Sequence, residues 1–99
     1  MKKLLVINGV NLNMLGVRET SIYGNKTYSD LKKYIKQYAK SKSIHIDFFI
    51  SNYEGKIIEK IQNMKNKYDG LIINPGAYSH YSIAILDALR ILSVPIIEV

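Results

Sequence analysis

The chain has 99 residues, with 14 lysines and arginines against 8 aspartates and glutamates, a net charge of +6, and no cysteine. This length fits one domain spanning residues 1–99, because domains peak at about 100–150 residues. The lack of cysteine excludes a disulfide framework and a thiolate metal site, and two histidines make a histidine-based metal site unlikely to form. We therefore expect no metal and no membrane association, and a reducing cytoplasm as the location.

The apolar run at residues 4–7 predicts a strand buried on both faces of a parallel sheet. Residues 11–26 show no sustained period and predict a long loop of the kind that carries function. Thr27 and Asp30 resemble a capping box at the start of a helix that ends near Ser41. The expected apolar stripe of this helix consists of Leu31, Tyr34, Ile35 and Tyr38.

Residues 44–50 are β-branched and aromatic and predict a second strand, followed by a turn at residues 51–55. A second helix is expected up to Asp69-Gly70, with one face formed by Ile57, Ile58, Ile61, Met64 and Tyr68.

Residues 71–73 predict a third strand, which Pro75 interrupts because proline cannot donate to a strand ladder. A third helix follows at residues 82–92, and Pro95 opens a fourth strand at residues 96–99. The expected inner face of the third helix is Ile83, Ala84, Ala88, Ile91 and Leu92.

Strict alternation of strands and helices predicts an α/β fold, a flavodoxin-like doubly wound parallel sheet with strand order 2-1-3-4. In such sheets the ligand lies beyond the carboxyl ends of the strands, where the winding reverses. This places the loop after the first strand and the loop at residues 74–81 at the site. Together they hold a cluster of neutral hydrogen-bonding side chains around Arg18 and His80.

Four motifs in this order resemble the type II 3-dehydroquinate dehydratases. Residues 7–16 read Ile-Asn-Gly-Val-Asn-Leu-Asn-Met-Leu-Gly, followed by Arg18-Glu19 and Tyr23-Gly24. Residues 51–55 read Ser-Asn-Tyr-Glu-Gly, and residues 73–80 read Ile-Asn-Pro-Gly-Ala-Tyr-Ser-His. The fourth motif, Pro-Ile-Ile-Glu-Val, closes the chain at residues 95–99.

The resemblance implies elimination of water from 3-dehydroquinate to give 3-dehydroshikimate through an enolate, without a cofactor, in the shikimate pathway of aromatic amino acid biosynthesis or in the quinate pathway. The implied catalytic residues are Tyr23 as the base, Arg18 close to it, and Asn11, which helps to hold a water at the enolate oxygen. The implied substrate-binding residues are Asn74, Gly76, His80 and Asp87. Asp87 reaches a neighbouring subunit in the family's trimers, four of which form a dodecamer.

In that family the strand Ile-Glu-Val runs directly into a catalytic histidine, which Glu98 would orient. The resemblance therefore implies that the family's last strand and helix lie outside these 99 residues, and that the activity of this stretch on its own is in doubt. An alternative is a truncated, inactive remnant that acts as an assembly or anion-binding module. A basic RNA-binding domain is a further alternative that rests on the net charge alone. We expect no nucleic-acid partner, because the lysines cluster on predicted helix surfaces that face solvent.

Overall fold

The computed structural model describes residues 1–9, 27–74 and 83–99. They form a four-stranded parallel sheet in the order β2-β1-β3-β4, as the sequence predicts. The elements follow one another as β1 (Lys2–Asn8), α2 (Tyr28–Ser41), β2 (Ile44–Ile50), α3 (Glu54–Gln62), β3 (Gly70–Asn74), α5 (Ile83–Ile91) and β4 (Ile96–Glu98).

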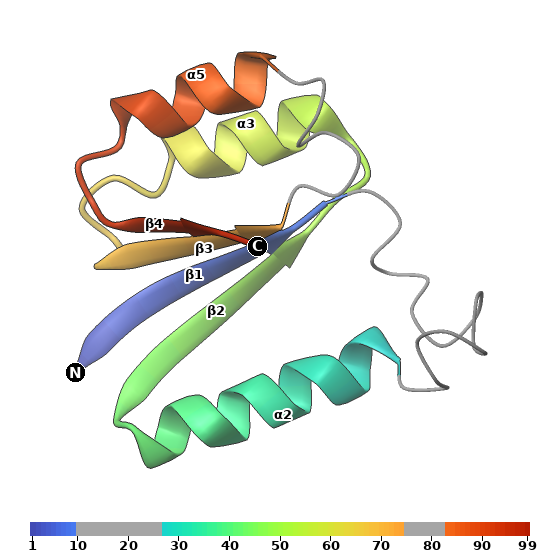
Figure 1. Ribbon diagram of the computed structural model, residues 1–99, viewed down its shortest axis with the longest axis vertical. Coiled ribbons are helices and arrows are strands. Elements are labelled where there is room, and N and C mark those ends of the chain that lie inside the picture. Colours follow the sequence, from blue (N-terminus) through green and yellow to red (C-terminus); the bar gives the residue numbers. More distant parts are fainter. Residues whose placement is uncertain (10–26, 75–82) are drawn as a thin grey trace.

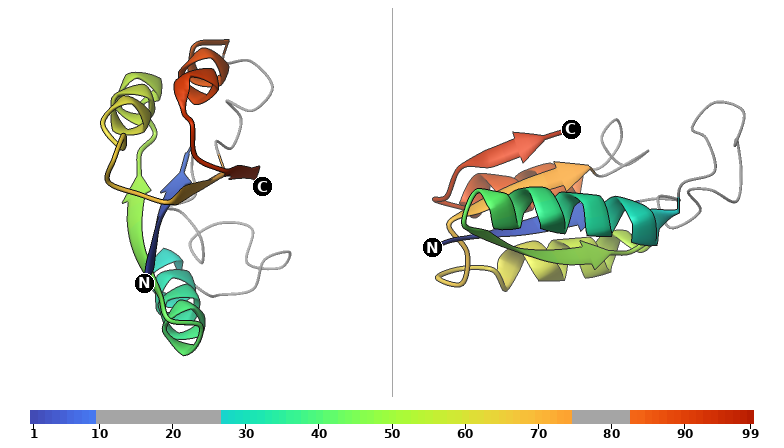
Figure 2. Two further views of the ribbon diagram at one scale, coloured as in Figure 1. Left: turned by 90° about the vertical axis from the view of Figure 1, so that its left-hand side faces the viewer. Right: turned by 90° about the horizontal axis from the view of Figure 1, so that it is seen from below.

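The helices lie on both faces of the sheet, with α3 and α5 side by side on one face and α2 on the other (Figure 1 and Figure 2). Side chains alternate between the faces of a strand, so Leu5 and Ile7 of β1 and Leu71 and Ile73 of β3 face α3 and α5. All four are at most 2% exposed. They form the main core together with Ile57, Ile61, Met64, Ile85 and Ala88.

Helix α2 begins with the predicted capping box. The Oγ1 atom of Thr27 accepts from the backbone N–H of Asp30 at 3.1 Å, and Oδ2 of Asp30 accepts from the N–H of Thr27 at 2.9 Å. Two backbone donors at the start of the helix are satisfied in this way. The helix packs mainly on β2, the edge strand of the sheet.

The second predicted helix is too long. Helix α3 ends at Gln62, and the chain then turns through Asn66, which adopts a left-handed φ of 64°. Tyr68 therefore lies outside the helix, although it still packs against the core. Gly70 then opens β3 where a Cβ atom would lie 3.1 Å from Cδ2 of Leu4 and 3.4 Å from the carbonyl oxygen of Pro95.

Two predicted helix faces are also wrong in part. On α2, Tyr34 and Tyr38 are 71% and 62% exposed, because the helix contacts the sheet along the side that carries Ala39. On α5 the buried residues are Ile85 and Ala88, while the ends of the predicted face point outward: Ile83 is 81% exposed and Ile91 is 75% exposed. No helix within the described ranges is long and apolar enough to span a membrane.

A candidate active site at the carboxyl edge of the sheet

The carboxyl ends of β1, β2 and β3 meet around Asn8. Asn8 is in register with Asn74 of β3 on one side and with Ile50 of β2 on the other. Beyond the ladder, the N–H of Gly9 donates to the carbonyl of Asn74 at 2.7 Å, and the N–H of Ser51 donates to the carbonyl of Asn8 at 3.1 Å. These bonds fix where the three loops leave the sheet.

Asn8 is a polar side chain in a buried position, only 8% exposed. Its Nδ2 atom lies 3.4 Å from the hydroxyl oxygen of Tyr28, to which it donates. Tyr28 is the first residue of α2, so this bond joins the start of the helix to the end of β1. Tyr28 was not singled out in the sequence analysis. The available signal was its place directly after the Thr27 cap, which puts it at the carboxyl edge.

The helices that follow β2 and β3 begin at this edge and direct backbone N–H groups toward it (Figure 1). Helix N-termini carry a partial positive charge that favours anions. Helix α3 has Glu54 in its first turn, whereas α5 has no acidic residue in its first turn. The edge is therefore suited to an anionic ligand near the start of α5.

Three of the predicted site residues lie in the described part of the chain. Asn74 ends β3 beside Asn8 at the carboxyl edge. Glu98 is exposed on β4, in register with Ile73. Asp87 is exposed on the outer side of α5, away from the core. The structure therefore brings Asn74 to the edge and places Asp87 on a different surface.

The other predicted residues lie outside the described ranges: Asn11, Arg18, Tyr23, Gly76 and His80. Among the residues that the structure describes, no group of three or more histidine, cysteine, aspartate or glutamate side chains is arranged to hold a metal ion. What the described residues provide is a rigid edge with amide groups and helix N-termini, chemistry suited to binding an oxygen-rich anion through neutral donors.

Comparison with known proteins identifies the family of this chain. The family model for dehydroquinase class II matches residues 2–99. The chain belongs to this family. It is 56% identical over all 99 residues to a 3-dehydroquinate dehydratase from Clostridium botulinum strain Hall, and 54% identical to one from Endomicrobium trichonymphae.

Solved structures agree with the assignment to the class II dehydroquinases. The crystal structure of the type II dehydroquinase from Butyrivibrio crossotus matches 98% of this chain with a TM-score of 0.93 and 55% sequence identity. That from Propionibacterium acnes matches 99% with a TM-score of 0.92 and 38% identity. The chain spans 67% of the Clostridium botulinum protein and 68% of both crystallised chains, or about two thirds of its relatives.

Proposed function

We propose that this dehydroquinase supplies the carboxyl-edge part of a site that dehydrates 3-dehydroquinate to 3-dehydroshikimate without a cofactor. The observation that carries the proposal is the match of residues 2–99 to the family, together with 56% identity to a curated 3-dehydroquinate dehydratase. The cysteine-free chain suits a reducing cytoplasm, where we place the protein.

In the proposed reaction Tyr23 removes a proton from the carbon beside the ketone, and an enolate forms. A histidine beyond β4 would then act as the general acid and protonate the departing hydroxyl, which leaves as water while the enolate returns to the ketone. A tyrosine ordinarily has a pKa of about 10, so it is a weak base at neutral pH unless a nearby cation favours the tyrosinate. We assign that part to Arg18. Asn11 would hold a water at the enolate oxygen, with the backbone turn at Gly76 on the same side, because donors placed where charge develops stabilise the transition state.

Substrate binding is assigned to Asn74 and His80. Asn74 suits this role because it ends β3 beside the buried Asn8, where an amide can donate and accept without adding a titratable group. The N-terminus of α5 at the same edge, with no acidic residue in its first turn, favours the negative charges of the substrate carboxylate and the enolate. Glu98 would orient a histidine that follows β4 in longer family members.

The proposal is tested in a chimera in which the part of the Clostridium botulinum dehydratase outside the match is joined after Val99. Tyr23→Phe should lower kcat by several orders of magnitude and change substrate affinity less than about tenfold, because the hydroxyl acts mainly in the transition state. Tyr34→Phe removes an exposed hydroxyl and is the matched control. A Tyr23→Phe chimera that retains more than a tenth of the parental kcat would refute the role of Tyr23. An inactive parental chimera would instead favour the assembly or anion-binding alternative.

We also propose that copies of the chain associate through the outer face of α5. This face combines the exposed apolar residues Ile83, Leu86 and Ile91 with opposite charges on Asp87 and Arg90. A contiguous set of exposed apolar residues is typical of an interface between proteins. In such an assembly Asp87 would reach the site of a neighbouring subunit, as in the trimers and dodecamers of the family.

Subunit mixing tests this role of Asp87. Chimeric Asp87→Ala and Tyr23→Phe subunits should each be nearly inactive, and mixing them should restore activity, because some sites then combine both intact side chains from different chains. Native mass spectrometry confirms that mixed oligomers have formed. If mixed oligomers form and their activity stays as low as that of the two separate variants, Asp87 acts within its own chain or has no part in the reaction.

A further inference from the structure

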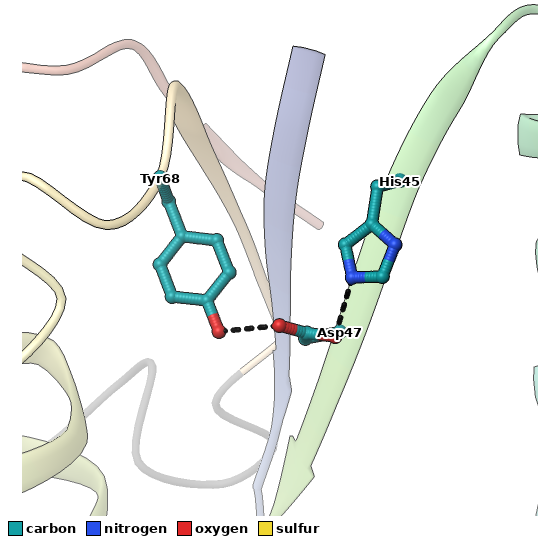
Figure 3. Close-up of polar contacts among 3 residues, drawn as sticks. All are labelled: His45, Asp47 and Tyr68. Carbon is teal, nitrogen blue, oxygen red and sulfur yellow. Dashed lines mark hydrogen bonds and ion pairs between the residues drawn. The ribbon is translucent and has the colours of Figure 1, made fainter. Parts of the chain in front are cut away.

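A polar cluster lies at the opposite, amino end of the sheet, on the face covered by α3 and α5. The carboxylate of Asp47, in β2, uses both of its oxygens (Figure 3). The hydroxyl of Tyr68 donates to Oδ2 at 2.7 Å, and Nε2 of His45 lies 2.9 Å from Oδ1. Because an ionised carboxylate can only accept, Nε2 carries the hydrogen and donates.

The bond between Tyr68 and Asp47 joins β2 to the segment that leads into β3, a strand with which β2 does not pair. Strand β1 lies between β2 and β3, and Asp47 is in register with Leu5 of β1. Tyr68 precedes β3 and reaches over β1 to the edge strand, as Figure 3 shows. The bond therefore acts as a brace across β1.

The Tyr68 end of the brace is firmly held. At the next residue, the N–H of Asp69 donates to the carbonyl of Lys3 at 2.7 Å, and Oδ2 of Asp69 accepts from the N–H of Lys3 at 2.8 Å. The ammonium of Lys3 lies 5.2 Å from the centre of the Tyr68 ring, within the range of a cation–π interaction. The Tyr68 ring also packs against the core.

The Asp47 end lies in an edge strand that contains no buried residue. None of the seven residues of β2 is buried, and β2 pairs only with β1. Helix α2 packs mainly on this strand. At the carboxyl edge, the bonds of Asn8 to Ser51 and Tyr28 fix the end of β2 and the start of α2. At the amino end, within the described residues, the brace is the side-chain hydrogen bond that ties β2 to another segment.

We propose that the Asp47–Tyr68 brace is an acid-sensitive latch that holds the amino end of edge strand β2 against the sheet. While Asp47 is ionised, the latch is closed. Protonation of Asp47 removes the charge that strengthens both hydrogen bonds, and the amino half of β2 then opens locally, together with the end of α2 that packs on it. Such local opening is expected at an edge strand, which pairs with one neighbour in the described sheet and has no buried residue.

The charged and titratable groups that face Asp47 are Lys3 of β1, His45 of β2 itself and Tyr68 ahead of β3. The hydrogen bond from Tyr68 is the largest influence and, with His45 and Lys3, holds the pKa of Asp47 below its ordinary 3.8 despite an opposing effect of burial. A carboxyl group with a lowered pKa stabilises the closed form well above pH 3.8, and this stabilisation is lost as the pH falls through the lowered value.

Hydrogen exchange of the amides of residues 44–48, corrected for intrinsic exchange and measured from pH 7 to below the pKa of Asp47, tests the latch in the 99-residue protein. The amides of β3 are the internal reference. At pH 6.5 Tyr68→Phe should increase opening of the amino half of β2 by about three- to tenfold, in line with the loss of one hydrogen bond to a partly exposed carboxylate. Once the pH falls below the lowered pKa of Asp47, wild type and Tyr68→Phe should converge, because protonation of Asp47 has then released the latch. Asp47→Asn should abolish the acid-driven rise, and Tyr34→Phe, which removes an exposed hydroxyl from α2, should leave opening unchanged.

If the role of Tyr68 were purely structural, Tyr68→Phe would increase opening equally above and below the pKa of Asp47, or would affect β3 as much as β2. Either result would overturn the proposal. Carbon-13 NMR titration of the Asp47 carboxyl gives a second measurement that does not require a stable Asp47 variant. Its pKa should lie below 3.8 in wild type and should rise in Tyr68→Phe. An Asp47 pKa that Tyr68→Phe does not change would also refute the latch.

Discussion

Tyr68 shows how a single contact changes the ionisation of a side chain. Burial and the hydrogen bond to the negative carboxylate of Asp47 raise the pKa of Tyr68 to about 12, from an ordinary value of 10.0. A group whose pKa is raised by folding stabilises the protein at every pH below its unfolded value. While Asp47 is ionised, the contribution of this bond is therefore complete up to about pH 10 and is lost as the pH rises toward 12.

We predict that Tyr68 stays protonated at pH 11, because its pKa is raised to about 12. Absorbance at 295 nm, which reports tyrosinate, should therefore rise between pH 9 and pH 11 by the same amount in wild type and Tyr68→Phe. Circular dichroism at each pH establishes that the protein is still folded. A smaller rise in Tyr68→Phe than in wild type would show that Tyr68 ionises normally.

Individual side-chain partners were the part of the molecule that the sequence predicted least well. Asn8 belonged to the predicted polar cluster, and it lies at the predicted edge. Its bond to Tyr28 was not predicted, nor was the bond between Asp47 and Tyr68, which are 21 residues apart. Both bonds depend on how a helix or a turn returns to the sheet, and that geometry is set by tertiary packing rather than by local sequence patterns.

At the scale of elements, the end of α2 offers a test of backbone strain. Ser43 follows the helix cap with a left-handed φ of 58°, a conformation that glycine adopts without the steric cost paid by residues with a Cβ atom. Ser43→Gly should therefore increase the free energy of unfolding by about 0.5–1 kcal/mol, as measured in urea. The neighbouring Lys42, with φ of −102°, is the matched control.

Lys42→Gly should decrease the free energy of unfolding, because its backbone gains nothing from glycine and the unfolded chain becomes more flexible. Equal effects of the two substitutions would contradict the strain argument, since they differ mainly in the sign of φ.

The existence of the helices and strands was predicted well, but the direction of the helix faces was not. Periodicity locates an apolar stripe on a helix, and the partner element decides which part of the stripe is covered. Leu31, Tyr34 and Tyr38 of α2 lie beside its buried side and are 37%, 71% and 62% exposed. The end of α3 was missed because Met64 and Tyr68 are apolar and pack on the core from a turn, so they continue the helical pattern without continuing the helix.

At the scale of the whole molecule, strand order followed from rules that apply to any alternating α/β chain. Parallel strands joined by right-handed crossovers leave few arrangements, and β2-β1-β3-β4 is one of the simplest. The two faces of this sheet are covered unequally. Helices α3 and α5 cover one face, whereas α2 alone lies on the other, beside edge strand β2 (Figure 2). On β4, Ile97 is 60% exposed.

We predict that this uneven cover of the sheet makes the 99 residues prone to aggregate when they are expressed alone. Exposed apolar side chains lie on α2 and, at the opposite edge of the sheet, on β4, and they favour association with other chains. Strand β4 is also an unprotected sheet edge in the described structure. A polypeptide of these 99 residues should bind the dye ANS and elute partly as aggregates in size-exclusion chromatography. The chimera with the remaining part of the Clostridium botulinum enzyme should bind less dye and elute as a defined oligomer.

Dehydratase turnover should also differ between the 99-residue polypeptide and the chimera. In the proposed mechanism a general acid beyond β4 contributes about 10² to 10⁴ in rate, and binding of the substrate carboxylate makes proton removal by Tyr23 intramolecular. The 99-residue polypeptide should therefore turn over 3-dehydroquinate at less than about a thousandth of the chimera's rate, while its circular dichroism shows a folded α/β domain. A higher rate from the folded polypeptide would mean that residues within these 99 supply the general acid. His80, placed here in substrate binding, would then be the first side chain to test, since His45 lies at the amino end of the sheet, in the Asp47 cluster.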